Sequence, residues 1–171
     1  TSYVHTNAYN IQKQNLMQQS KELSEIIDAW IQTDGVALRS YAKNPTVVTE
    51  LTTGNIREIP VLIDDLYTSS NYLDTIFITD KNGVVVADYN KSNNGNDVSS
   101  LPAWIACSRQ GKKFYVDQYA TKSSITGNVS FLIAAPVYNE GNKLVGMVAF
   151  SMDLEKFAKK YIYTKKYGEE G

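Results

Sequence analysis

Residues 112–154 read KKFYVDQYATKSSITGNVSFLIAAPVYNEGNKLVGMVAFSMDL, and this stretch decides the fold. Two short clusters of turn-forming residues, at 123–127 and 139–142, divide it into runs rich in apolar, β-branched and aromatic side chains. Short turn clusters between such runs are typical of antiparallel strands that follow one another along the chain. The stretch therefore predicts three antiparallel strands, at 112–122, 128–138 and 143–154.

Two acidic residues occupy notable positions on these predicted strands. Because side chains alternate between the two faces of a strand, Tyr115, Asp117 and Tyr119 share one face of the first strand. Asp153 follows the apolar run LVGMVAFSM of the third strand. A carboxylate on a largely buried sheet is costly unless a backbone group, a side chain or a ligand pairs with it. Asp117 and Asp153 are therefore candidate ligand contacts.

The composition excludes several classes of function but does not identify one. The 171 residues fit one domain, and Lys plus Arg number 17 against 18 for Asp plus Glu, so no excess charge attracts nucleic acid or anionic membrane. The single cysteine, Cys107, excludes an internal disulfide and a cysteine-based metal cluster. The single histidine, His5, lies near the start, which argues against Ser-His-Asp and Cys-His catalysis. Without a phosphate loop or metal-ligand spacing, we expect no cofactor and no metal site.

The chain begins with one long helical pattern at residues 1–43. Apolar residues recur at helical spacing in its second half, which we expect to pack on the sheet. The whole helix is longer than the sheet needs for cover, and its polar first half is expected to project away. A projecting helix needs a partner, either another copy of the chain or a membrane span just upstream. No run reaches 18 consecutive apolar residues. Because the sequence starts abruptly within a helical pattern, we expect the chain to be an excised part of a longer protein.

The remaining elements alternate between short helices and strands. The motif Asp80-Lys-Asn-Gly83 predicts a tight turn between two strands. Asp80 is expected to be a turn residue and not a metal ligand. The predicted elements are helices at 46–53, 55–69 (interrupted near Pro60), 103–110 and 155–163, and strands at 71–79 and 84–88. Five strands with helices segregated along the chain indicate an α+β domain with a long N-terminal helix packed on an antiparallel sheet.

Five segments in this order resemble the extracytoplasmic Cache sensor domains of bacterial transmembrane receptors. The segments are FITDKNGVVV at 77–86, PAW at 102–104, FYVD at 114–117, APVYNEG at 135–141 and VGMVAFSMDL at 145–154. The resemblance covers residues from about Arg39 to Lys160 and implies a long helix behind a five-stranded, PAS-like antiparallel sheet. In this family small molecules bind on the opposite face of the sheet, under the helix and loops that precede the third strand.

The resemblance also implies ligand positions. Amino-acid-binding members hold the ligand ammonium with a Tyr and two Asp, to which Tyr115, Asp117 and Asp153 correspond. They hold the ligand carboxylate with an aromatic-Arg-Trp-Tyr cluster. Trp104 stands at the Trp position, whereas Pro102 replaces the Arg. An ammonium side without a carboxylate clamp suits an amine, an amino-acid-like molecule or an N–H-rich heterocycle.

Other roles for the same residues stay open. Trp104 is also a natural core residue, and Asp153 begins the pattern Asp-Leu-Glu-Lys, which is good N-cap chemistry for the closing helix. Asp117 is alternatively a surface residue of its strand. Tyr89 and Tyr119 are weaker candidates for ligand contact.

The predicted organisation is a stalk and packing helix at 1–43, a sensor module at 44–160 and a linker at 161–171. The linker resembles the start of the membrane-proximal module of double Cache domains. We expect a non-catalytic periplasmic or extracellular sensing domain of a chemoreceptor, histidine kinase or cyclic-dinucleotide enzyme. Its expected partners are a small-molecule ligand, its own membrane spans and cytoplasmic output domain, and a second copy through the first helix.

Two rivals come from other classes. A pilin-like structural subunit also sets a long N-terminal helix against an antiparallel sheet. An enzyme with Asp117 and Asp153 as a carboxylate pair, as in glycosidases, is the third choice.

Overall fold

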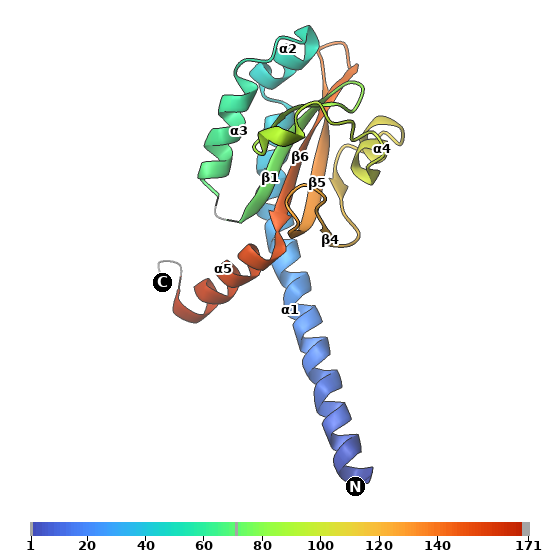
Figure 1. Cartoon of the computed structure of the whole chain (residues 1–171), viewed down its shortest axis with the longest axis vertical. Coiled ribbons are helices and arrows are strands. Elements are labelled where there is room, and N and C mark those ends of the chain that lie inside the picture. The colour runs from blue at the N-terminus through green and yellow to red at the C-terminus, as the bar shows by residue number, and fades with distance from the viewer. Residues whose placement is uncertain (1, 71, 169–171) are drawn as a thin grey trace.

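The computed structural model describes residues 2–70 and 72–168. A long helix, α1 (Ser2–Ala42), runs behind a sheet and projects well beyond it, with shorter helices around the sheet (Figure 1). The other helices are α2 (Pro45–Thr53), α3 (Ile59–Thr68), the short 3₁₀ helix η1 (Lys91–Asn93), α4 (Pro102–Ser108) and α5 (Leu154–Tyr167). The strands are β1 (Leu73–Asp80), β2 (Val85–Asp88), β3 (Tyr115–Val116), β4 (Thr121–Lys122), β5 (Val129–Tyr138) and β6 (Leu144–Asp153).

The sheet is antiparallel throughout, in the order β2-β1-β6-β5-β3, and β4 also pairs with β5. The predicted α+β architecture, with the long helix packed on an antiparallel sheet, is confirmed. No helix in the described part of the chain has a segment apolar enough to cross a membrane.

The predicted strand at 112–122 is interrupted, so the sheet has six strands and not five. The backbone N–H of Asp117 donates to the carbonyl of Leu132, as expected of a strand. The N–H of Leu132, however, donates to the side-chain Oδ2 of Asp117 at 3.0 Å. Because this carboxylate takes the place of a backbone acceptor, the chain leaves β5 after Asp117 and pairs again only at Thr121. Tyr119, between the two short strands, is 74% exposed.

The second half of α1 covers one face of β5 and β6, as predicted. Trp30 meets Phe131 edge to face at 6.1 Å between ring centroids, and Tyr41 meets Phe150 in the same way at 6.2 Å. With α3 over β1 and β2, these contacts form the main hydrophobic core. The first half of α1 projects away from the sheet (Figure 1).

Two helix boundaries differ from the sequence prediction. α3 begins at Ile59, because Pro60 fits the first turn of a helix, where its missing N–H costs nothing. α5 continues to Tyr167, and Tyr163 contacts Tyr167 one turn later at 4.9 Å between ring centroids, a spacing that supports a helix. Residues 169–171 of the predicted linker lie outside the described part of the chain.

A buried carboxylate positions α3. Glu50 of α2 is 8% exposed and accepts hydrogen bonds from the backbone N–H groups of Arg57 at 2.7 Å, Glu58 at 2.9 Å and Ile59 at 3.1 Å. These groups lie at the start of α3 and would otherwise lack acceptors. Burial tends to raise the pKa of Glu50, but the backbone hydrogen bonds outweigh it and hold the pKa below its ordinary value.

We expect Glu50→Gln to lower the free energy of unfolding by about 1–2 kcal/mol near neutral pH, because the amide loses the charge and one acceptor oxygen. The pKa of Glu50 is lower in the folded state than in the unfolded state. Its contribution is therefore present above the unfolded pKa and fades as pH falls through the folded pKa. Chemical denaturation at pH values from neutral to acidic should show wild type and variant converging at low pH. The exposed Glu140→Gln serves as control, and a difference that does not change with pH would contradict this role.

Candidate ligand-binding site

Strand register determines which side chains share the face of the sheet that α4 covers. Residues directly opposite each other in antiparallel strands point to the same face. One row across this face is Tyr115, Ala134, Ala149, Phe77 and Asp88. The neighbouring row is Asp117, Leu132, Ser151 and Thr75, and Ser130 opposite Asp153 begins the next. The face therefore carries the predicted ammonium-binding residues, with small side chains at Ala134, Ala149 and Ser151 and large ones at Phe77 and Leu132.

The part of this face under α4 is apolar. Trp104 is 5% exposed and packs in a cluster with Phe77, Val85, Cys107 and Met147. A Cβ atom on Gly83 would lie 3.0 Å from Cε2 of Trp104, which shows how closely the β1–β2 turn approaches the indole. Trp104 is thus a packing residue at the edge of the site. Burial raises the pKa of the Cys107 thiol to about 11, so this group stays protonated and is a poor nucleophile.

The rest of the face is polar and buried. It carries Thr75, Asp88, Ser130, Ser151 and Asp153, all less than 9% exposed, together with the partly buried Asp117. Asp74, 7% exposed, lies at the register shift of β1 between Leu73 and Thr75. A buried carboxylate is normally paired with a cation, but no ion pair to these groups occurs among the described residues. Nor does any group of three or more His, Cys, Asp or Glu in that part of the chain converge as a metal site would require. The polar half of the face is therefore negatively charged.

Tyr115 and Asp117 form a hydrogen-bonded pair at one side of this region. The Tyr115 hydroxyl donates to Oδ1 of Asp117 at 2.7 Å, and the N–H of Leu132 donates to Oδ2 at 3.0 Å. Burial raises the pKa of Asp117, and the two hydrogen bonds only partly oppose it. Burial and the adjacent carboxylate also raise the pKa of Tyr115, which keeps its phenol a donor. Each carboxylate oxygen retains acceptor capacity for a ligand N–H.

Asp153 serves as the N-cap of α5. Its Oδ1 accepts from the N–H of Lys156 at 3.0 Å, the capping geometry that the sequence indicated. Its side chain is 5% exposed, and in the described part of the chain Oδ2 has no hydrogen-bond partner. One oxygen of Asp153 is thus engaged in the fold, and the other is available.

Asp74 and Asp88 were missed by the sequence analysis, and both fix loops around the polar region. Asp74 accepts from Thr126 Oγ1 at 2.8 Å and Asn128 Nδ2 at 2.9 Å, which ties the turn before β5 to β1. Asp88 accepts from the Thr75 hydroxyl, from the N–H of Asn90 and from Asn93 Nδ2, which holds η1. Ser151 could have been found from the sequence, because side chains alternate along a strand and residues 151 and 153 therefore lie on the same face.

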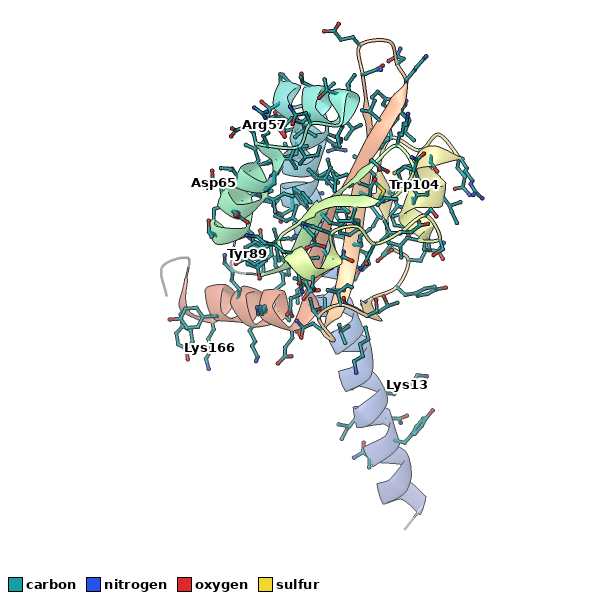
Figure 2. All side chains as sticks on the ribbon, turned by 45° about the horizontal axis from the view of Figure 1, so that its top comes forward. Lys13, Arg57, Asp65, Tyr89, Trp104 and Lys166 are labelled. Atoms are coloured by element: carbon teal, nitrogen blue, oxygen red, sulfur yellow. The ribbon has the colours of Figure 1, made fainter. Side chains whose placement is uncertain are left out.

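The two weaker candidates lie apart from this group. Tyr119 points into solvent between β3 and β4. Tyr89 stacks on Tyr67 of α3 at 3.5 Å between ring centroids, beneath α3 and well away from Trp104 (Figure 2). It lines a groove of about 400 Å³ with Asp64, Thr68 and Lys91. The structure therefore brings together Tyr115 and Asp117, packs Trp104 in the apolar cluster that Tyr115 adjoins, and places Asp153 on the same face.

The turn residue Asp80 is placed as expected. Its Oδ1 accepts from the backbone N–H of Asn82 at 2.8 Å and of Val84 at 3.1 Å, within the β1–β2 hairpin. The left-handed conformation at Gly83, with a φ of 79°, completes this turn.

Comparison with known proteins gives a family and a set of similar folds. A family model described as Cache domain matches residues 3–171. The sensor domain of the V. cholerae histidine kinase DctB is similar with a TM-score of 0.70 and 16% identity, over 88% of this chain and 59% of that one. The ligand-binding domain of the Campylobacter jejuni chemoreceptor Tlp3, in complex with 4-methylisoleucine, is similar with a TM-score of 0.65 and 14% identity, over 90% of this chain and 63% of that one. The E. coli DcuS sensor domain is similar with a TM-score of 0.61 and 14% identity, over 81% of this chain and 96% of that one.

The chain thus spans about three fifths of the DctB and Tlp3 domains and nearly all of the DcuS domain. A search of curated proteins found no match.

Proposed function

This chain belongs to the Cache domain family, and we propose that it is an extracytoplasmic sensing domain that binds a small organic cation for a transmembrane receptor. One observation carries the ligand class: the Tyr115–Asp117 pair lies on the sheet face opposite α1, and among the described residues no basic side chain forms an ion pair with its carboxylate. A partly buried carboxylate that no described basic side chain pairs with is satisfied best by a ligand cation. The family match favours sensing over the pilin-like structural role, and the proposal assigns no catalysis.

The proposed ligand is an amine, an amino-acid-like molecule or an N-heterocycle. Pro102, at the start of α4, provides no charge for a ligand carboxylate, and bidentate recognition by Arg has no close substitute. The aromatic ring of Tyr115 adds cation–π attraction for an ammonium group. The Tlp3 domain holds 4-methylisoleucine, which supports a ligand of comparable size with an ammonium group.

Tyr72 joins the elements through which binding would be relayed. Its carbonyl accepts from the N–H of Asp153 at 2.8 Å, and its hydroxyl donates to Asp34 of α1 at 2.8 Å. Its ring contacts Phe157 of α5 at 4.9 Å between centroids, with Lys160 at 4.9 Å from the ring centroid. Movement of β6 around a ligand would therefore shift α1 and α5 relative to each other. We propose that these helices connect to membrane spans and an output domain, and that α1 pairs with a second copy.

A binding screen tests the proposal. The purified chain is screened by thermal shift against amines, amino acids, purines, pyrimidines and organic acids, and hits are measured by calorimetry. We expect hits among cationic compounds, with Asp117→Asn weakening them about 10- to 100-fold because a charged hydrogen bond is lost. The exposed Asp65→Asn is the matched control. Hits confined to carboxylic acids, or unchanged affinity in Asp117→Asn, would contradict the proposal.

A further inference from the structure

The groove of about 400 Å³ beside α3 lies outside the candidate site, at the β2 edge of the sheet. Two residues of α3, one of η1 and the residue that follows β2 line it: Asp64, Thr68, Lys91 and Tyr89. Asp88 is opposite Phe77, on the face that carries Asp117. Tyr89, one residue later, turns its ring the other way and stacks it on α3. The groove is therefore on the α3 side of the sheet, away from the Tyr115–Asp117 pair and from Trp104 (Figure 2).

The Tyr89 ring is a braced and accessible aromatic surface. It lies 3.5 Å from the Tyr67 ring between centroids, with 13° between the ring planes, so Tyr67 covers one of its faces. Its backbone N–H donates to the carbonyl of Ile76 at 3.0 Å, which ties it to β1. The side chain is nevertheless 37% exposed and lines the groove. A ring held in one orientation before binding loses little conformational entropy when a ligand stacks on it.

The segment that carries Lys91 is also fixed. Asp88 is 4% exposed and accepts from the N–H of Asn90 at 2.7 Å and from Asn93 Nδ2 at 2.7 Å. These two residues flank Lys91 in the chain, so the carboxylate of Asp88 anchors η1 against the end of β2. The groove is thus formed by the fold itself, between an anchored 3₁₀ helix and α3.

The polar groups of the groove include one acid and one base that are not paired. Asp64 is half-buried and Lys91 is exposed, and neither side chain forms an ion pair or hydrogen bond with another described residue. The Thr68 hydroxyl donates to the carbonyl of Asp64 at 2.9 Å, which leaves its oxygen free to accept. The groove therefore offers two acceptors and one donor around an aromatic ring, and its two charges cancel.

We propose that this groove is a saccharide-binding subsite, in which the C–H face of one sugar ring stacks on Tyr89. A pyranose ring has an apolar face and a rim of hydroxyls, and each hydroxyl both donates and accepts. Such a ring can donate to Asp64 and Thr68 and accept from Lys91. Neither charged group is buried, so neither requires an ionic ligand, whereas the accessible Tyr89 ring favours a ligand with an apolar face. The subsite goes beyond the proposed function, because it uses other residues on the other side of the sheet.

Saturation-transfer NMR on the purified chain tests the subsite with neutral disaccharides: cellobiose, maltose, lactose and N,N′-diacetylchitobiose. We expect at least one to bind, with the strongest transfer to the C–H protons of one ring face. Sorbitol, which has the hydroxyls but no ring, should not bind. Tyr89→Ala should weaken disaccharide binding at least about tenfold in chemical-shift titrations, because the stacking surface is lost. Tyr89→Phe keeps the ring and should stay within about twofold of wild type.

Matched variants separate the groove from the rest of the surface. Asp64→Asn should weaken the disaccharide about three- to tenfold, because a charged hydrogen bond is lost. Asp65→Asn, one position along α3 and not lining the groove, should leave binding unchanged. Tyr119→Ala removes a 74% exposed ring elsewhere and should also have no effect. Asp117→Asn should not alter disaccharide binding, since that carboxylate lies on the other face.

Three results would overturn the subsite. They are no binding by any of these disaccharides, equal binding of sorbitol, and binding that Asp117→Asn abolishes but Tyr89→Ala does not. Binding of free alanine in place of the sugars, lost in both Asp64→Asn and Lys91→Gln, would refute the saccharide class and make the groove a zwitterion site. None of these results changes the expected binding of cations at Asp117, so the subsite and the proposed function can fail separately.

Discussion

Trp104→Ala should lower the free energy of unfolding by about 4 kcal/mol, the cost typical of removing a large buried aromatic side chain. The indole is 5% exposed and fills the space between α4 and the sheet, against Phe77, Val85 and Met147. The cavity cannot close easily, because Gly83 on the β1–β2 turn already lies against the ring. For a chain of this length the melting temperature should fall by about 8–16 °C, measurable by calorimetry or guanidinium titration.

Two companion variants separate packing from ligand contact at Trp104. Trp104→Phe keeps most of the apolar volume and should cost about half as much as the alanine variant. Tyr119→Ala removes a 74% exposed ring and should change stability by no more than about 0.5 kcal/mol. A loss below about 2 kcal/mol for Trp104→Ala would show that the indole is not a core residue. In that case its place at the edge of the site would reflect ligand contact alone.

The architecture was predictable because its signals are local and repeated. Apolar runs at 128–138 and 143–154, separated by short turn clusters, indicated β5 and β6, and the Asn-Gly turn indicated the β1–β2 hairpin. The break between β3 and β4 was not predictable, since it depends on the Asp117 side chain accepting from Leu132 on another strand. Sequence periodicity contains no information on which acceptor a backbone N–H will choose.

The site was predictable only in part, for a related reason. Strand alternation predicted that Tyr115 and Asp117 share one face of the sheet, and in the structure their side chains form a hydrogen bond. Asp74 escaped notice because its importance depends on partners 52 and 54 residues away, Thr126 and Asn128. Tyr89 was a weaker candidate for ligand contact, yet its ring stacks on Tyr67 of α3. Contacts between distant segments decide such cases.

Gly146→Ala should lower the free energy of unfolding by about 3 kcal/mol, as much as the truncation of a large core side chain, although it adds only one methyl group. A Cβ atom at this position would lie 2.2 Å from the carbonyl oxygen of Thr79 and 2.8 Å from Cδ1 of Leu51. The Leu51 side chain can rotate, but the Thr79 carbonyl belongs to the β1 backbone. The methyl group therefore fits only if β1 and β6 separate where Asp80 faces Gly146.

Gly141→Ala is the matched control, because its nearest contact would be an ordinary 3.4 Å to Asn139 Oδ1. We expect that variant to stay within about 0.5 kcal/mol of wild type in guanidinium titrations. β6 carries Ser151 and Asp153 and leads directly into α5, so separating it from β1 should also weaken cation binding in calorimetry. Loss of stability together with loss of binding would show that the β1–β6 pairing supports both the sheet and the ligand face. If Gly146→Ala matched the control in stability, β1 and β6 would not be packed as closely as the structure shows.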